Sequence, residues 1–325
     1  MKITMRHGNG GAETAELIET LFMKHFANRI NAKMEDAAVL DLDGKLAFTT
    51  DSFVVKPLFF PGGDIGRLAV CGTVNDILTT GGQPRYLSAS FIIEEGLDVR
   101  DLDKIARSMG EAAREAGVEI VAGDTKVVEG DGGLYINTSG LGVIKGKPVC
   151  FDEVAEGDAI IVTGHLGDHH ACILSQRMGI ENAIASDVAP LNAIVGALAG
   201  GNISLHGMRD ITRGGLATVL NEISAACSFQ IAVDEAEIPV AEEVNSLCKI
   251  LGLDPLYMGN EGKLLVVVPE REAHKALAII KHAAYGGNAG VVGRFQKGAG
   301  VVLNTRLGGR RILQPMMGDG LPRIC

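Results

Sequence analysis

Residues 85–124, RYLSASFIIEEGLDVRDLDKIARSMGEAAREAGVEIVAGD, contain the pattern that decides the fold. A β-rich run at 86–95 is followed by an amphipathic helical pattern at 99–116, which ends at Gly117. A second β-rich run then covers 118–124. Strands that alternate with helices of this length are typical of an α/β domain.

The neighbouring segments extend this domain to about residue 146. Residues 12–30 have helical spacing, and two β-rich runs around Asp43-Gly44 predict a hairpin. A helix is expected over 66–82 and a long strand over 134–144. The predicted order β-β-α-β-α-β-β fits one α/β domain.

A second α/β block begins at GDAIIVTG, residues 157–164. Its predicted helices lie near 168–178, 187–200, 214–227, 239–251 and 270–283, and its strands near 229–233, 263–268, 290–295 and 300–304. After residue 313 the periodicity stops, and glycines and prolines predict a flexible tail. The predicted division is 1–35 for a glycine loop and helix, 36–146 for the N-terminal domain, 147–313 for the C-terminal domain and 314–325 for the tail.

Composition excludes several classes of protein. The 325 residues have a formal net charge of -10, which argues against nucleic acid as a partner. No apolar run is long enough for a membrane span, and the N-terminus lacks the apolar core of a signal peptide. Most of the 6 cysteines lie in apolar surroundings, as reduced thiols of a cytoplasmic protein do.

Four aspartates are candidates for a magnesium site. Asp51 and Asp124 are expected at strand exits, where ligands of α/β sheets bind, and Asp36 precedes the first strand. Asp76 lies inside a helix with no cation within one turn, so its carboxylate needs a partner from elsewhere. Any one of them alone would be interpreted as a cap or a solvated charge. Together they suit Mg²⁺ held between carboxylates and phosphates.

Glycine-rich loops are candidates for phosphate contact, because no P-loop motif occurs. The loop HGNGGAE (7–13), with Gly10 and Gly11, precedes a helix whose free amide groups could hold an anion. Asp210 and Thr212 precede another helix, where simple capping is an equal alternative. His165, His169 and His170 could hold a metal, but ordinary loop polarity is favoured for them.

Motifs along most of the chain resemble the HypE family of [NiFe]-hydrogenase maturation factors. The resemblance runs from residue 7 to residue 325 and is carried by HGNGG, FTTDSFVVKPLFFPGGDIG, CGTVNDI, RYLSASFIIEEGL, GDTKVV, INTSGLG, GDHH, RDITRGGL, NEGKL and the terminal PRIC. The terminal motif is specific for this family. The TDS, ND and GD acids are shared with the wider ATP-using superfamily of aminoimidazole ribonucleotide synthetase, selenophosphate synthetase and thiamine-monophosphate kinase.

The resemblance implies two α/β domains of the aminoimidazole ribonucleotide synthetase type, with N-terminal domains that form a β-barrel in a homodimer. It implies ATP and Mg²⁺ in a groove between the domains. The implied metal acids are Asp51, Asp76, Asp124 and, less firmly, Asp36; the implied ATP-binding residues are Asp51, Asp76, Asp124, Asn75, Thr125, Asp210, Gly10 and Gly11.

The resemblance also implies a reaction. Cys325 receives a carbamoyl group from the partner HypF, and this thiocarboxamide is dehydrated to a thiocyanate while ATP becomes ADP and phosphate. The cyanide then passes to iron on the HypC–HypD complex. Lys126 and Glu261 would lie near the end of the tail, with Glu261 as the general base and Lys126 orienting the amide, although these two roles can be exchanged.

Two other functions stay open from the residues alone. A small-molecule kinase of the same superfamily would turn over ATP with a free substrate and ignore the loss of Cys325. A scaffold that uses LPRIC as a docking peptide would show no dependence on ATP.

Overall fold

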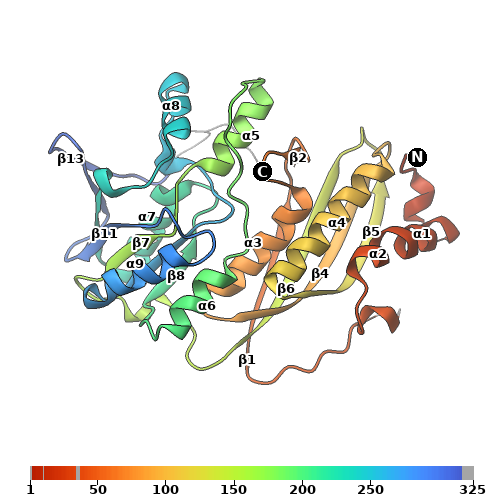
Figure 1. The fold of residues 1–325 in the computed structure, drawn as a ribbon, viewed down its shortest axis with the longest axis horizontal. Coiled ribbons are helices and arrows are strands. Elements are labelled where there is room, and N and C mark those ends of the chain that lie inside the picture. Colours follow the sequence, from red (N-terminus) through yellow and green to blue (C-terminus); the bar gives the residue numbers. More distant parts are fainter. Residues whose placement is uncertain (1, 10, 34–36, 317–325) are drawn as a thin grey trace.

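The computed structural model describes residues 2–9, 11–33 and 37–316, which form a four-stranded, a seven-stranded and a small two-stranded sheet with their helices (Figure 1). The N-terminal part comprises α1 (Ala12–Leu17), α2 (Met23–Phe26), β1 (Lys45–Phe53), β2 (Phe59–Phe60), β3 (Gly63–Asp64), α3 (Ile65–Thr79), β4 (Gln83–Glu94), α4 (Val99–Ala116), β5 (Glu119–Val128) and β6 (Leu134–Ile144). A π-helical turn at Ile18–Phe22 joins α1 to α2. Asp36, Gly10, Cys325 and most of the predicted tail lie outside the described residues.

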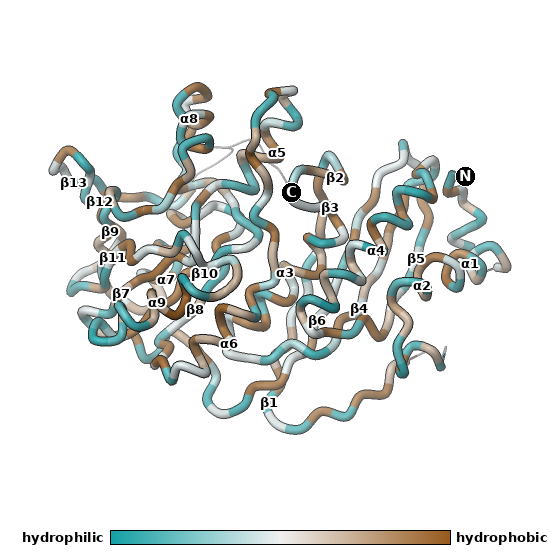
Figure 2. Tube along the Cα trace, in the orientation of Figure 1, coloured by the Kyte–Doolittle hydropathy of each residue, from teal (hydrophilic) through white to brown (hydrophobic). Residues whose placement is uncertain are grey.

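The C-terminal part is built on a seven-stranded sheet in the order β13-β12-β9-β11-β7-β10-β8. Its elements are β7 (Ala159–Val162), α5 (Asp168–Met178), α6 (Asn192–Gly200), β8 (Gly207–Asp210), α7 (Gly215–Cys227), β9 (Gln230–Asp234), α8 (Glu242–Leu251), β10 (Leu264–Val268), α9 (Ala273–His282), β11 (Gly290–Gln296), β12 (Val301–Asn304) and β13 (Arg310–Ile312). The short strands β8 and β13 were not predicted. Apolar residues concentrate where the helices meet the sheets (Figure 2).

Local capping explains the two long helices of the N-terminal part. The carboxylate of Asp64 accepts hydrogen bonds from the amides of Gly66 and Arg67 at 2.8 and 2.9 Å, which begins α3. Asp98 accepts from the amide of Arg100 and begins α4, and Gly117, at φ 67°, ends it. The two helices pack side by side over one face of the first sheet (Figure 1).

The first sheet has the order β1-β6-β4-β5, so that β1 and β5 are its two edge strands. Side chains alternate between the face under the helices and an outward face. The outward face carries exposed apolar side chains, with Phe48 at 68%, Leu46 at 50% and Ile92 at 46% exposure. The sheet is open in the described chain, and the predicted barrel is not present within it.

Two expectations for the N-terminal part were wrong. The hairpin at Asp43-Gly44 does not form, because residues 37–43 make no strand and β1 pairs with β6 instead. Neither Asp51 nor Asp124 stands at a strand exit, because β1 continues to Phe53 and β5 continues to Val128.

In the part of the chain that the structure describes, no helix is long and apolar enough to cross a membrane. Five cysteines, residues 71, 150, 172, 227 and 248, are free thiols.

Candidate functional site

A groove of about 450 Å³ lies between the two parts of the molecule. Its walls come from β1, from the last turns of α3, and from β8 with the loop that follows it. Three of the predicted acids, Asp51, Asp76 and Asp210, line this groove together. The sequence separates them widely, and the fold brings them to one place.

Crowded carboxylates set the electrostatics of this groove. Burial, with the nearby charge of Asp210, raises the pKa of Asp76 to about 6, although the hydroxyl of Thr49 donates a hydrogen bond to it at 2.8 Å. Burial also raises the pKa of Asp210, which Arg209 and the Thr212 hydroxyl partly offset. The expectation that Asp76 needs a distant partner is confirmed by its bond from Thr49.

The capping alternative for Asp210 was wrong. The N-cap of α7 is Gly214, which has a φ of 81° and offers no side chain. Asp210 ends β8 and turns toward the groove, where Arg209 and Arg213 are also found.

Asp124 and Lys126 lie elsewhere, on the edge strand β5. Lys126 Nζ contacts Asp124 Oδ1 at 2.9 Å, and both side chains are more than half exposed. They border a pocket of about 330 Å³ between β5 and the N-terminal helices, which Thr125 and Gly8 also line. Within one chain they are therefore separated from the interdomain groove by the width of the sheet, about 14 Å at the usual strand spacing.

Asn75 connects the two parts of the chain. Its side-chain amide donates to the carbonyl of Ala189 at 3.0 Å and accepts from the amide of Leu191 at 3.0 Å. It also contacts the carbonyl of Glu261 at 3.4 Å and is 3% exposed. Both functions of the amide are engaged, so the structure favours a connecting role over the predicted contact with ATP.

Glu261 lies next to Asn75 at the border between the two parts. Burial raises its pKa well above the usual value, and the charges of Asp187, Asp210 and Asp51 add to the effect, while Arg213 opposes it. A carboxyl group with a raised pKa is suited to proton transfer near neutral pH. Lys126 is not beside Glu261 in a single chain.

The predicted glycine loop and histidines also have definite places. Gly11 is the N-cap of the short helix α1, and a Cβ at Gly8 would collide with the main chain of Val127 on β5. His165 lies in the loop before α5, as favoured, whereas His169 and His170 are buried within α5, so for these two the interpretation as polar loop residues was wrong. No group of metal-ligating residues that includes them occurs among the described residues.

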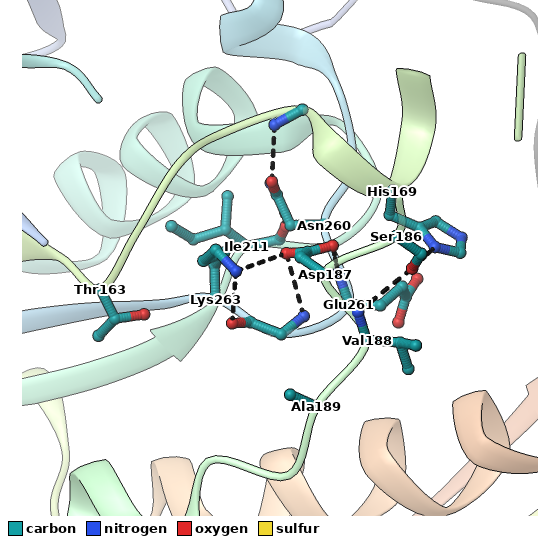
Figure 3. Close-up of polar contacts among 12 residues, drawn as sticks. Thr163, His169, Ser186, Asp187, Val188, Ala189, Ile211, Asn260, Glu261 and Lys263 are labelled. Atoms are coloured by element: carbon teal, nitrogen blue, oxygen red, sulfur yellow. Dashed lines mark hydrogen bonds and ion pairs between the residues drawn. The ribbon is translucent and has the colours of Figure 1, made fainter. Parts of the chain in front are cut away.

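Sequence reasoning missed Asp187 and Lys263. Lys263 Nζ contacts Asp187 Oδ2 at 3.1 Å, and the two side chains are 9% and 2% exposed (Figure 3). In the sequence, Lys263 is one charge in NEGKL, and Asp187 is the first residue of the helix predicted near 187–200, which begins only at Asn192. Only the apolar run that follows Lys263 hints at burial.

The two α/β parts with a groove between them have the architecture of the AIR synthase related proteins. The model of the AIR synthase related protein N-terminal domain matches residues 34–144, and that of the C-terminal domain matches 155–305. The chain belongs to this family and, within it, to the HypE carbamoyl dehydratases, as the following similarities show.

Carbamoyl dehydratase HypE of Rhodobacter capsulatus is 45% identical over 100% of this chain and 98% of its own length. A crystal structure of hydrogenase maturation protein HypE in complex with ATP is 47% identical, covers 99% of both chains and has a TM-score of 0.95. A crystal structure of a HypE–HypF complex is 47% identical, with a TM-score of 0.81 over 94% of this chain and 100% of that one.

Proposed function

We propose that this chain uses ATP to dehydrate a carbamoyl group on the sulfur of its own Cys325, producing a thiocyanate. The cyanide so made becomes a ligand of the iron of [NiFe]-hydrogenase. The observation that carries the proposal is the groove in which Asp51, Asp76 and Asp210 meet, in a chain whose relatives are carbamoyl dehydratases. We also propose that the boundary between the two domains lies near residue 146 and that residues 314–325 form the tail that carries Cys325.

The groove fits a nucleotide with Mg²⁺. Its carboxylates repel one another, and hard oxygen donors are the ligands that Mg²⁺ prefers. No group of three or more His, Cys, Asp or Glu side chains that could hold a metal occurs among the described residues, so the ion would take most of its ligands from water and phosphate. Asp51 and Asp76 would hold the ion, and the ion would neutralise charge during phosphoryl transfer.

ATP is required because the amide oxygen is a poor leaving group. The carbonyl oxygen of the thiocarboxamide attacks the γ-phosphorus, and ADP departs. The oxygen then leaves as phosphate while the nitrogen loses its two protons and the carbon–nitrogen triple bond forms. A base must accept these protons, and we assign this role to Glu261, with Lys126 orienting the amide or stabilising its charge. The exchanged assignment stays open.

Intact mass spectrometry tests the proposed function. We expect the chain to gain one carbamoyl group when it is incubated with HypF, carbamoyl phosphate and ATP. Because the same ATP supports dehydration, the residue that carries the group should then lose the mass of one water as ATP is consumed. ATP turnover with a free small molecule, and no change of mass, would instead favour a kinase. The absence of any effect of ATP would favour a scaffold.

We also propose a homodimer in which the outward faces of two N-terminal sheets close a barrel. The exposed Phe48, Leu46 and Ile92 support a covered face, because apolar patches on a sheet are usually buried by a partner. A second copy would also bring Lys126 and Asp124 of one chain to the groove of the other. Each active site would then combine residues from both copies.

Mixed dimers test this arrangement. We expect Lys126→Ala and Glu261→Gln homodimers to be at least about 100-fold slower than wild type, while a dimer of one Lys126→Ala chain and one Glu261→Gln chain regains about half the wild-type activity, since one site is intact. The matched control pairs a wild-type chain with a chain that carries both substitutions. It should be inactive if sites are shared, and half active if each site lies within one chain, which would refute the proposal.

HypF is the proposed source of the carbamoyl group, and the HypC–HypD complex the proposed acceptor of the cyanide. The solved HypE–HypF complex of a relative 47% identical supports the first assignment. The free thiols of the described cysteines support a cytoplasmic location.

A further inference from the structure

Residues 186–191, which we call the strap, run between the two parts of the molecule and bind to the N-terminal part. The amide of Ser186 donates to the carbonyl of Pro61 at 2.8 Å, and Arg67 Nε donates to the carbonyl of Val188 at 3.1 Å. Asn75 of α3 bonds to the strap at Ala189 and Leu191. The strap is therefore fixed to α3, the helix that carries Asp76.

The side chain of Asp187 points from the strap toward the loop that carries Glu261. Its two oxygens accept hydrogen bonds from the amides of Glu261 at 3.1 Å and Gly262 at 3.3 Å. Lys263 contacts the same carboxylate and also donates to the carbonyl of Gly262 at 3.2 Å (Figure 3). A Cβ at Gly262 would collide with the carbonyl oxygen of Asp187, so the close approach requires glycine.

We propose that Asp187, held by Lys263, is a positioning residue that fixes the main chain of Glu261 against the strap and so aligns its carboxyl group with the nucleotide groove. The inference rests on the proposed function, in which Glu261 moves protons. The inference connects the proposed base to the nucleotide acids. Asp187 aligns Glu261, and the strap that contains Asp187 is hydrogen-bonded to α3, the helix of Asp76. The positions of Asp76 and Glu261 relative to one another are thereby fixed.

Stability alone does not explain this pair. Removing a carboxylate and an ammonium group from water costs about as much as their attraction returns, and apolar replacements of buried pairs are often neutral. What an apolar pair cannot supply is two acceptor oxygens for the amides of Glu261 and Gly262. A positioning role therefore requires the carboxylate of Asp187, because its oxygens accept the hydrogen bonds from these two amides.

The first test is Asp187→Asn, compared with wild type in single-turnover dehydration of the carbamoylated chain. Asparagine loses one acceptor and directs an amide group at the Lys263 ammonium. We expect the rate constant to fall about 10- to 100-fold, as when supporting groups of an active site are removed. The ATP concentration for half-maximal rate should not change. Asp158→Asn is the control, because the side chain of Asp158 is 5% exposed against 2% for Asp187, accepts from an amide at 2.8 Å and pairs with His206 at 2.7 Å, away from Glu261.

The second test separates positioning from folding. The double variant Asp187→Leu/Lys263→Met removes both charges and should fold, yet it offers no acceptor to the loop. We expect faster hydrogen exchange at the amides of Glu261 and Gly262 in the ATP-bound protein, and a rate constant at least as low as that of Asp187→Asn. A wild-type rate, or unchanged amide exchange, would overturn the inference, as would a change confined to ATP affinity. If the wild-type chain itself loses no water, the proposed function fails, and amide exchange still decides whether Asp187 holds Glu261.

Discussion

Replacing Cys325 by alanine should abolish thiocyanate formation while ATP binding persists. In the proposed mechanism Cys325 carries the substrate, so its loss removes the carbamoyl group rather than weakening a catalyst. We expect no residual product at any enzyme concentration. The groove acids come from β1, α3 and β8, so calorimetry with ATP and Mg²⁺ should give the wild-type affinity.

The matched control is Cys150→Ala. Cys150 is a partly exposed thiol whose Sγ donates to Asp152 at 3.3 Å, and it belongs to no proposed site. Intact mass spectrometry should show one carbamoyl group, and then the loss of one water, on this control but neither change on Cys325→Ala. If the Cys325→Ala chain still donated cyanide to iron, the carrier role would be refuted. Continued turnover of ATP with a free substrate would point to a kinase.

The sequence predicted those parts of the fold that local chemistry determines. Helix α3 was expected from its apolar run and α4 from its periodicity and Gly117; the structure adds Asp64 as the N-cap of α3. Residues 37–43 were wrongly predicted as a strand because they contain an apolar run. A strand also needs a neighbouring strand to pair with, and β1 pairs with β6 instead of with this segment. The short strand β8 forms because β10 pairs with it.

The site shows the same limit. A buried acid without a local cation can be recognised from helical spacing, and Asp76 was recognised in this way. Which acids meet depends on the order of strands: Asp51 and Asp124 were predicted together, yet they lie on opposite edges of one sheet. Asp187 could not be found, because its partners, the amides of Glu261 and Gly262, are 74 and 75 residues away.

Replacing Glu261 by glutamine should lower the rate of dehydration by about 10²- to 10⁴-fold, the usual contribution of a general base. Glutamine keeps the size of the side chain but cannot accept a proton. The carbamoylated variant should still bind ATP, and phosphate release in single turnover should fall with the loss of water. A variant with wild-type rate would remove Glu261 from the mechanism and leave Lys126 as the candidate base.

The pH dependence of the wild-type rate gives an independent check. A base works only when it is deprotonated, and burial together with the charge of Asp187 raises the pKa of Glu261 well above the usual 4.5. The rate should therefore fall as the pH drops through this raised pKa, well above pH 4.5. The residual activity of Glu261→Gln should lack this acid limb. An acid limb that persists in the variant would belong to another group.

The same substitution should stabilise the protein at neutral pH. A carboxyl group whose folded pKa is raised favours the folded state below its unfolded pKa and loses that contribution as the pH rises through the folded pKa. At higher pH the ionised Glu261 therefore costs stability that glutamine avoids. We expect the variant to have the higher Tm at pH 8 and the difference to disappear below about pH 4.5, the unfolded value.

Glu115→Gln is the matched control, because the pKa of Glu115 is lowered in the folded protein whereas that of Glu261 is raised. Although burial opposes it, hydrogen bonds from Arg67 at 2.8 Å and from Tyr285 lower the pKa of Glu115. Its contribution to stability is present above the unfolded pKa and is lost as the pH falls through the lowered pKa of the folded state, so Glu115→Gln should lower the Tm at pH 8. Glu261→Gln should raise the Tm at pH 8. Burial and the neighbouring acids make the ionised Glu261 unfavourable for folding, and only the reaction requires it there.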